Sequence, residues 1–434
     1  MPDLRNAGPA GLNLLTASEA AKKIAAGAVT SEALVRDCLA RIAARDTQVH
    51  AWAHVDPAQA LFAARAADNA PRKGPLHGVP VGIKDVLDTF DMPTEYGSIL
   101  YRGHRPLTDS ACVGALRAAG AVILGKTATT EFAAPYPTTT RNPHDFTRTP
   151  GVSSSGSAAA VADFQVPLAL GTQTGGSVIR PATLCGVFGY KASLEGLDRG
   201  NIRNLKPALD TLGLFARSVP DLALLRAAMT GAAAPAAATV DRPPRIGVCR
   251  TPFWSAAQTE TIDAMESAAA AVARAGATVG EAPLPPAFAD LPASFRVISQ
   301  YEAAIGMADE AERGFHTLNP WSRDAITAGR KWTADEYGRA KAEAARCRGL
   351  LAELFASFDA LLTPSDRGEA PPDLRSIHDS PFNGSWTLMH VPCVTLPAYT
   401  GPNNMPVGVQ IVGPHNADDR TLAIAGWLAS VLMG

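Results

Sequence analysis

The stretch "VPLALGTQTGGSV", residues 166–178, joins an apolar run to a glycine-rich run within one short segment. The apolar half is typical of a buried strand, and the glycine half predicts a loop that leads into a helix. Strand, loop and helix in this order are the building unit of α/β folds. The segment therefore predicts an α/β protein, provided that the same order recurs along the chain.

The order does recur on both sides of this stretch. "VPVGIKDVL", residues 79–87, predicts a short buried strand, and residues 114–124 predict a helix that ends near Gly120, followed by a strand. "RIGVCR" at 245–250, a helix over 260–275 and a strand over 277–284 form a βαβ-like unit. We therefore expect a layered α/β fold with a mixed or mainly parallel sheet.

Helix signals frame both ends of this α/β pattern. Residues 16–70 predict helices, and Thr30 and Ser31 offer hydroxyl caps to one of them. That helix carries an apolar stripe formed by Leu34, Val35, Cys38, Leu39 and Ile42. Thr333 and Glu336 predict a capping box for a helix over 334–358, and "DALLTP" predicts a strand after it.

Composition limits the class of protein. The chain has 434 residues, 47% of them hydrophobic, and a net charge of -2 without a long basic run. Nucleic acid and anionic membranes are therefore not expected partners. The N-terminus lacks the pattern of a signal peptide, and no apolar run approaches the roughly 18 residues of a membrane span. Six scattered cysteines without a CxxC pair predict reduced thiols, and together these features predict a cytoplasmic protein.

Two motif interpretations are set aside. "GAVILGKT", residues 120–127, matches the pattern GxxxxGK[ST] of a phosphate-binding loop. Its four variable residues are apolar, so they predict a buried strand rather than an open loop around a phosphate. The nine histidines show no metal-ligand spacing, so no metal site is expected.

The chemistry is expected in two serine and glycine clusters, "GVSSSGSAAAV" at 151–161 and "GTQTGGSVIRP" at 171–181. Either cluster alone is typical of a loop. The segment between them is apolar, however, so both loops are anchored on buried structure. Lys84 also lies in an apolar strand, where it either forms an ion pair with the adjacent Asp85 or becomes a neutral base, because burial lowers the pKa of lysine. A neutral lysine and two hydroxyls would make nucleophilic catalysis possible without histidine.

These motifs resemble those of the amidase signature enzymes, which use a Ser-Ser-Lys triad. The matching segments are "GIKD" at 82–85, "PGVSSSGSAAAVA" at 150–162 and "LGTQTGGSVIRPATLCGVFGYKAS" at 170–193. A weaker similarity continues to "WTLMHVPCVTLPA" and "PVGVQIVG" near the C-terminus, so nearly the whole chain is covered. Within the family, the second cluster and "DMPTEYGSILYRG" most resemble malonamidases.

The resemblance implies a single amidase domain over residues 1–434 with a central mixed, largely parallel twisted sheet that helices cover on both faces. Its parts are an N-terminal helical segment (1–73), a signature core (74–221), a low-complexity linker (231–244) and a C-terminal α/β part (245–434).

The resemblance also implies roles for single residues. Ser177 matches the nucleophile, Ser153 the proton-relaying serine that follows a cis peptide bond, and Lys84 the base. The backbone N–H groups of Thr174, Gly175, Gly176 and Ser177 match the oxyanion hole, where donors stabilise a tetrahedral intermediate.

Two positions depart from the family pattern. Val152 stands where glycine is usual, and Gln173 stands where aspartate is more common. No metal or organic cofactor is implied.

We therefore expect an amide-bond hydrolase that acts on a small molecule through an acyl-enzyme. Arg180 either holds the carboxylate of a malonamate-like monoamide or supports the loop from within the protein. In the second case the pocket accepts aryl amides or carbamates (urethanes), lined by Trp386, Leu388 and Met389.

Two other interpretations stay open: a component of an amidotransferase that passes ammonia to an aminoacyl-tRNA, and a catalytically silent homologue. The resemblance also implies a homodimer, for which the amphipathic helices over residues 16–46 offer an interface.

Overall fold

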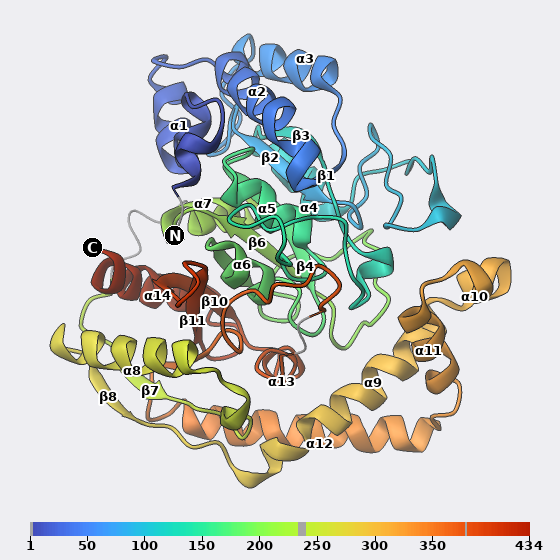
Figure 1. The fold of residues 1–434 in the computed structure, drawn as a ribbon, viewed down its shortest axis with the longest axis vertical. Helices are drawn as coiled ribbons and strands as arrows, with labels where there is room; N and C mark the ends of the chain where they lie inside the picture. Colours follow the sequence, from blue (N-terminus) through green and yellow to red (C-terminus); the bar gives the residue numbers. More distant parts are fainter. Residues whose placement is uncertain (1–2, 233–239, 378–379) are drawn as a thin grey trace.

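The structure is a computed structural model that describes residues 3–232, 240–377 and 380–434. In these ranges the strands form one 11-stranded sheet through the middle of the molecule, with helices on both faces (Figure 1). The strands are β1 (Trp52–His54), β2 (Pro80–Lys84), β3 (Val122–Thr127), β4 (Leu168–Gln173), β5 (Phe188–Lys191), β6 (Thr211–Ala216), β7 (Arg245–Val248), β8 (Thr278–Glu281), β9 (Ala360–Pro364), β10 (Cys393–Thr400) and β11 (Pro406–Val412). The predicted α/β fold with a mixed sheet is confirmed.

The strand order is β1-β3-β2-β4-β6-β5-β10-β11-β9-β7-β8. Parallel pairing occupies two blocks, β3-β2-β4 and β9-β7-β8. The sheet is less parallel than predicted, because all the other pairs of described strands are antiparallel. The connection between β10 and β11, residues 401–405, is too short for the crossover that a parallel pair needs.

The α-helices are coloured in chain order, from blue to red, in Figure 1. They are α1 (Ala17–Ala25), α2 (Ser31–Val49), α3 (Pro57–Asp68), α4 (Ala111–Ala118), α5 (Ser155–Ala162), α6 (Ile179–Cys185), α7 (Val219–Thr230), α8 (Thr259–Arg274), α9 (Leu291–Gly306), α10 (Ala308–Gly314), α11 (Pro320–Gly329), α12 (Ala334–Leu354), α13 (Gly384–Leu388) and α14 (Asp418–Met433). None of those in the described ranges is both long and apolar enough to cross a membrane.

Alternate residues of the central strands face two different hydrophobic cores. In β4, Leu168 and Leu170 belong to a cluster with α4, α7, α8 and α14, whereas Ala169 belongs to a cluster with α2, α3, α5 and α6. A strand presents successive side chains to opposite faces, so this division follows from the two-residue period. Both faces of β4 are covered, and the loop after it is held on buried structure as predicted.

The predicted helix caps are confirmed except for Ser31. Ser31 is the first residue of α2, and its hydroxyl donates to the carbonyl of Gly78 at 2.7 Å. Thr30 accepts a hydrogen bond from the N–H of Ala33 at 3.1 Å, and Thr333 and Glu336 form the capping box of α12. The predicted apolar stripe of α2 is largely buried inside the chain, where Leu34, Val35 and Cys38 pack on the α5 side of the sheet. This stripe is therefore not available as the surface of a dimer.

The structure also bears on the GxxxxGKT stretch and on the predicted linker. Residues 122–127 form β3, whose side chains are all buried, so the GxxxxGKT stretch is a strand as predicted. Of the predicted linker over 231–244, residues 233–239 lie outside the described residues.

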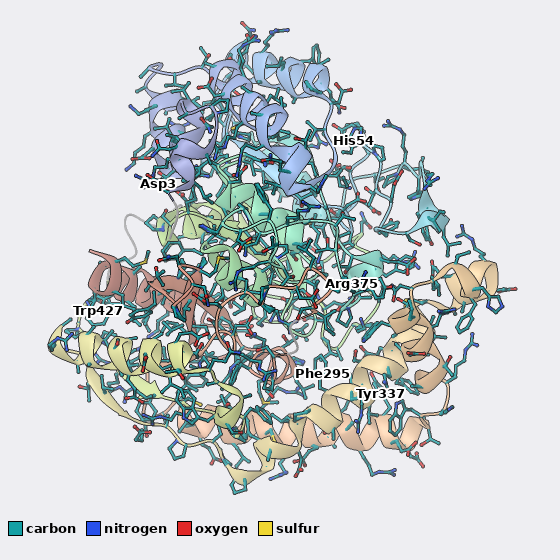
Figure 2. The ribbon with its side chains drawn as sticks, in the orientation of Figure 1. Asp3, His54, Phe295, Tyr337, Arg375 and Trp427 are labelled. Carbon is teal, nitrogen blue, oxygen red and sulfur yellow. The ribbon has the colours of Figure 1, made fainter. Side chains whose placement is uncertain are left out.

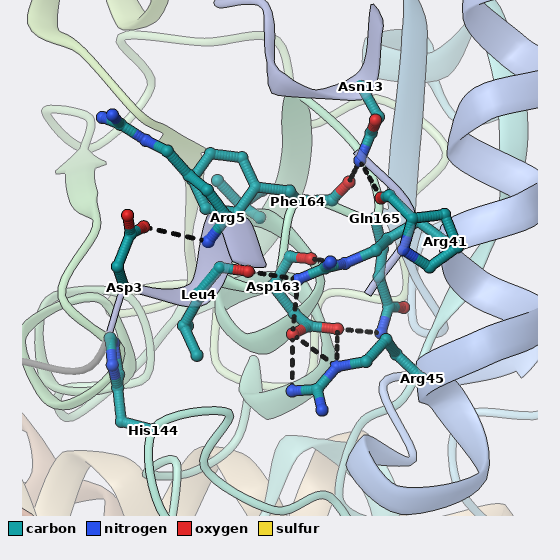
Figure 3. Close-up of polar contacts among 12 residues, drawn as sticks. Asp3, Leu4, Arg5, Asn13, Arg41, Arg45, His144, Asp163, Phe164 and Gln165 are labelled. Atoms are coloured by element: carbon teal, nitrogen blue, oxygen red, sulfur yellow. Dashed lines mark hydrogen bonds and ion pairs between the residues drawn. The ribbon is translucent and has the colours of Figure 1, made fainter. Parts of the chain in front are cut away.

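The end of α5 is anchored by two arginines of α2 (Figure 3). Arg41 donates to the backbone carbonyl of Asp163 at 2.8 Å, and Arg45 pairs with its carboxylate at 2.9 Å. The Asp163 side chain is fully buried, so the two guanidinium groups supply the charge partners that a buried carboxylate requires. This anchor fixes the helix that begins with the predicted serine cluster.

Candidate active site

The predicted catalytic residues lie at the carboxyl ends of two neighbouring parallel strands. Lys84 is the last residue of β2, and the second serine cluster begins in the last residues of β4 and continues into the loop after it. The first serine cluster runs from the loop before α5 into this helix, which packs on both strands. The carboxyl ends of parallel strands are where open α/β folds place their ligands.

Lys84 is fully buried, and its hydrogen-bond partners among the described residues are all neutral oxygens. Its Nζ donates to the hydroxyls of Ser153 and Thr172, at 2.8 Å each, and more weakly to the carbonyl of Thr172 at 3.4 Å. Burial lowers the pKa of Lys84 from 10.5 to about 7; the charge of Asp210 opposes this shift, and that of Lys206 adds to it. A lysine of this kind is available as a base near neutral pH.

The ion pair with Asp85 that the sequence left open is not formed by Lys84. Asp85 lies 3.2 Å from Nζ of Lys126, the buried lysine of β3. Adjacent residues of a strand point to opposite faces, and Asp85 directly follows the end of β2. Asp85 thus pairs with Lys126, and Lys84 has no carboxylate partner in the part of the chain that the structure describes.

The three consecutive serines have three different sets of partners. Ser153 accepts from Lys84, and the peptide bond that precedes it is cis, as the resemblance implied. Ser154 exchanges hydrogen bonds with the backbone of Thr172, at 3.1 and 3.3 Å, and Ser155 contacts the hydroxyl of Thr138. Val152 is buried in this structure. Only Ser153 of the three touches Lys84.

Ser177 lies in the loop between β4 and α6 and is partly exposed. Its carbonyl accepts from the N–H of Ser154 at 3.4 Å, which joins the two serine loops. Its hydroxyl forms no hydrogen bond within the described part of the chain. In the same ranges the backbone N–H groups of residues 174–177 donate to no protein acceptor, so they remain free for an incoming oxygen.

Gln173 explains how this loop keeps its shape. Its side-chain oxygen accepts from the N–H groups of Val178 and Ile179, at 2.9 and 3.1 Å, and its amide donates to Thr387 at 3.1 Å. The acceptor satisfies two N–H groups at the start of α6, and the donor ties the loop to α13. A carboxylate at position 173 would retain the first function and lose the second.

Arg180 lies beside the loop of residues 174–177, which we call the oxyanion loop after the role that the resemblance implies. It has no carboxylate partner among the described residues. Its Nη1 donates to the carbonyl of Ile377 at 2.8 Å, and its buried Nε has no partner. A Cβ built on Gly176 would lie 3.1 Å from Nη2 of Arg180, so the guanidinium lies directly against the loop. The charge is therefore not neutralised by a carboxylate of the described chain.

A cavity with about 490 Å³ of empty space, its open mouth included, adjoins these residues. Thr172 and Thr174 line it from the site, and Lys206 and Asp210 line it from the segment before β6. Asp210 accepts hydrogen bonds from the hydroxyl of Thr174 and from the N–H of Lys206. The cavity is thus lined by threonines of the candidate site and by a lysine and an aspartate from a distant segment.

Thr172, Lys206 and Asp210 were not assigned a role from the sequence. Thr172 is inside the second cluster, where its position directly after a strand glycine carried no distinguishing signal. Lys206 and Asp210 come from a segment without any catalytic pattern, and only the tertiary fold brings them to the cavity.

The predicted apolar pocket wall is wrong for three residues. Trp386, Leu388 and Met389 are each 1% exposed and belong to a core cluster of α9, α12 and α13. Phe295 of α9 lies nearer the oxyanion loop, since a Cβ on Gly175 would be 3.6 Å from its ring (Figure 2). The short helix α13 packs against α9, and this contact buries the side chains that the sequence assigned to a pocket.

Over the described ranges, no group of three or more histidine, cysteine, aspartate or glutamate side chains is placed to hold a metal ion. The groups that the site presents are the amine of Lys84, two serine hydroxyls and a row of backbone N–H donors.

Comparison with known proteins decides the family. The model of the amidase family matches residues 33–422, which include Lys84, both serine clusters and the segment that carries Asp210. The chain belongs to this family. It is an amidase-family enzyme, as its motifs implied.

Curated relatives cover almost the whole chain. A glutamyl-tRNA(Gln) amidotransferase subunit of Chloroflexus aggregans is 35% identical over 96% of this chain and 96% of its own length. The corresponding protein of Acidothermus cellulolyticus is 35% identical over 95% of this chain and 93% of its own length.

Solved structures with the same fold include an amidase and a hydrolase. A peptide amidase from Stenotrophomonas maltophilia superposes with a TM-score of 0.84 at 28% identity, covering 96% of this chain and 97% of that one. A 6-aminohexanoate cyclic dimer hydrolase with bound substrate superposes with a TM-score of 0.86 at 25% identity, covering 98% of both chains. A chain from a vestigial complex linked to the origins of an s-triazine catabolic enzyme has a TM-score of 0.87 at 29% identity, covering 96% of this chain and 98% of that one.

Proposed function

We propose that this protein hydrolyses the amide bond of a small molecule through a covalent acyl-enzyme on Ser177. The observation that carries the proposal is the contact between a buried lysine with a pKa of about 7 and the hydroxyl of Ser153, beside a loop of free N–H donors. A neutral amine, a relaying hydroxyl and an oxyanion site are together the requirements of serine-based acyl transfer.

The first half of the reaction forms the acyl-enzyme. Neutral Lys84 takes the proton of Ser153 as Ser153 takes the proton of Ser177, and Oγ of Ser177 forms a bond to the carbonyl carbon. The negative oxygen accepts hydrogen bonds from the N–H groups of residues 174–177. The C–N bond then breaks, and the leaving nitrogen receives the proton from Lys84 through Ser153.

The second half releases the acid. Water gives a proton to Lys84 through Ser153 and adds to the acyl carbon, and the same N–H groups hold the oxyanion. The bond to Oγ of Ser177 breaks, the proton returns to Ser177, and a carboxylic acid leaves. No step needs a metal or an organic cofactor, so chelators are expected to leave turnover unchanged.

For the substrate we propose a monoamide that carries a carboxylate, as malonamate does, with Arg180 as one contact. The guanidinium has no carboxylate partner in the described chain and lies against Gly176 of the oxyanion loop. An unneutralised guanidinium beside the reacting centre favours an anionic substrate group. Aryl amides and carbamates remain the alternative, because the same attack serves either carbonyl.

A second candidate is a component of an amidotransferase, which the names of the 35% identical relatives favour. The same triad chemistry would then release ammonia from an amide for transfer within a larger complex. The net charge of -2 and the lack of a basic run give no support for contact with tRNA by this chain itself.

The test uses the purified chain alone. A fluorophosphonate probe is expected to label the peptide that contains Ser177 in the wild type and to leave Ser177→Ala unlabelled. The wild type is then assayed on malonamate, aliphatic amides, an anilide, an aryl carbamate and glutamine. Labelling without hydrolysis of any of them would favour the amidotransferase function, and no labelling at all would overturn the serine mechanism.

A further inference from the structure

Lys206 is a buried cation without a counter-ion among the described residues. The residue is 4% exposed and lines the cavity beside the triad, together with Thr172 and Thr174. Within the described residues its Nζ forms no ion pair and no hydrogen bond; its contact is with the ring of Trp321, 5.5 Å from the ring centre. The side chain is buried, but its nitrogen is not among the fully enclosed unpaired atoms of the described residues, so the ammonium is accessible to a ligand.

The other charges in the cavity already have partners. Asp210 accepts from the hydroxyl of Thr174 and, at 2.9 Å, from the backbone N–H of Lys206. Arg203 forms an ion pair with Glu310 and donates to the hydroxyl of Tyr101 at 2.7 Å. Arg203 is thus paired, and the partners of Asp210 are neutral donors. Lys206 is therefore the cation that the described cavity lining leaves for a ligand.

The rest of the lining is mainly apolar. Its aliphatic and aromatic side chains are those of Val86, Leu87, Tyr96, Phe132, Ile202 and Leu205. Thr172, which hydrogen-bonds to Lys84, lines this cavity together with Lys206 and these apolar side chains. Such a cavity suits a molecule with an apolar segment that ends in an anion.

We propose that Lys206 is a specificity-determining residue that binds an anionic group of the substrate, separated from the reacting carbonyl by an apolar spacer. This inference rests on the proposed function and names its substrate class: primary amides with a distal carboxylate, longer than malonamate. Arg180 lies against Gly176 and does not line this cavity, so the two cations select carboxylates at different places on the acyl chain.

The kinetic test compares substrates in pairs of equal chain length. The monoamides of succinic, glutaric and adipic acid are each assayed beside the neutral aliphatic amide, at about pH 9, where Lys84 is neutral in all variants. Lys206→Met is expected to lower the kcat/KM ratio of anionic to neutral substrate by roughly ten- to a hundredfold, chiefly through KM. Lys206→Arg, which keeps the charge, is expected to restore most of the ratio.

The control is Lys331→Met, which removes an exposed lysine beyond the end of α11 and is expected to leave both the ratio and the activity unchanged. Thermal melts show that each variant is folded, and Lys206→Gln replaces Lys206→Met should the latter fail to fold. An unchanged ratio in folded Lys206→Met would overturn the inference while leaving acylation of Ser177 intact.

Binding gives a readout that does not need turnover. Calorimetry measures the affinity of glutarate and adipate for Ser177→Ala and for the double variant Ser177→Ala/Lys206→Met. A roughly tenfold or larger loss of affinity in the double variant supports the inference, and equal affinities overturn it. If Ser177 is never labelled by the probe, the proposed function fails, and this binding comparison still decides the role of Lys206.

Discussion

Asp85 follows Lys84 directly in the sequence, yet its carboxylate pairs with Lys126, 3.2 Å away on the neighbouring strand. Because of this pairing, one of two buried lysines has a counter-ion and the other has neutral hydrogen-bond partners. Lys126 has a counter-ion and holds the segment after β2 through the carbonyl of Leu87, at 2.9 Å. Lys84 has hydroxyl and carbonyl partners only, and burial brings its pKa to about 7.

The ion pair predicts a thermodynamic signature. Asp85→Asn leaves the ammonium of Lys126 buried without its counter-ion, so we expect a loss of about 3 to 5 kcal/mol in the free energy of unfolding. Asp85→Asn combined with Lys126→Met is expected to recover part of that loss, because the unpaired charge is removed. Urea unfolding of the two single variants and the double variant measures the coupling, and strictly additive effects would contradict the pairing.

Activity is expected to rise with pH through about 7. Below this value Lys84 is protonated and cannot accept the proton of Ser153, and above it the amine is neutral. Asp210 raises the pKa of Lys84 and Lys206 lowers it, so Lys206→Met is expected to move the acidic limb of kcat/KM to higher pH. A pH profile of both proteins on a neutral amide tests this, and a shift to lower pH would be inconsistent with it.

The burial of Lys84 is expected to lower the free energy of unfolding at neutral pH. Between pH 7 and 10.5 the unfolded chain binds one more proton at Lys84 than the folded chain, so this residue makes the free energy of unfolding rise with pH. Lys84→Met removes the buried amine, and we expect it to be inactive and at least as stable as the wild type at pH 7. The stability advantage of the variant shrinks toward pH 10, which urea unfolding at several pH values measures; a constant difference would argue against a lowered pKa.

Gln173 is expected to affect turnover through the oxyanion loop. Gln173→Leu removes the acceptor for the N–H groups of Val178 and Ile179, and we expect kcat to fall by roughly ten- to a hundredfold. Gln173→Glu keeps the acceptor and loses only the donor to Thr387, so it is expected to retain most of the activity. An equal fall of kcat in the two variants would show that turnover does not depend on the side-chain acceptor at position 173.

Arg180 is expected to distinguish carboxylate-bearing amides from aryl amides and carbamates. Arg180→Ala is expected to reduce kcat/KM for malonamate by about tenfold or more, with a much smaller effect on an anilide or an aryl carbamate. The panel is measured on wild type and variant under identical conditions. An equal loss on every substrate would mean that the hydrogen bond to Ile377 is structural and that malonamate-like substrates are not selected by this residue.

Local patterns determined much of this protein. The run from Val166 to Val178 forms a strand and then a loop, and α6 begins directly after it, because these preferences depend largely on nearby residues. The strand continues to Gln173, three residues into the half that was predicted as a loop. The ordered serine and glycine motifs likewise led to the amidase family and to Lys84, Ser153 and Ser177. A long motif is recognised from the order of its residues along the chain, so the tertiary structure is not needed to find it.

Only the tertiary structure decided which partners these groups have. The counter-ion of Lys126 lies 41 positions away in the chain, and Lys206 reaches the triad's cavity from a segment without a motif. Trp386, predicted in a pocket, is buried in the core because α13 packs on α9. Charge pairing and burial depend on distances across the fold, and a sequence records order along the chain but not those distances.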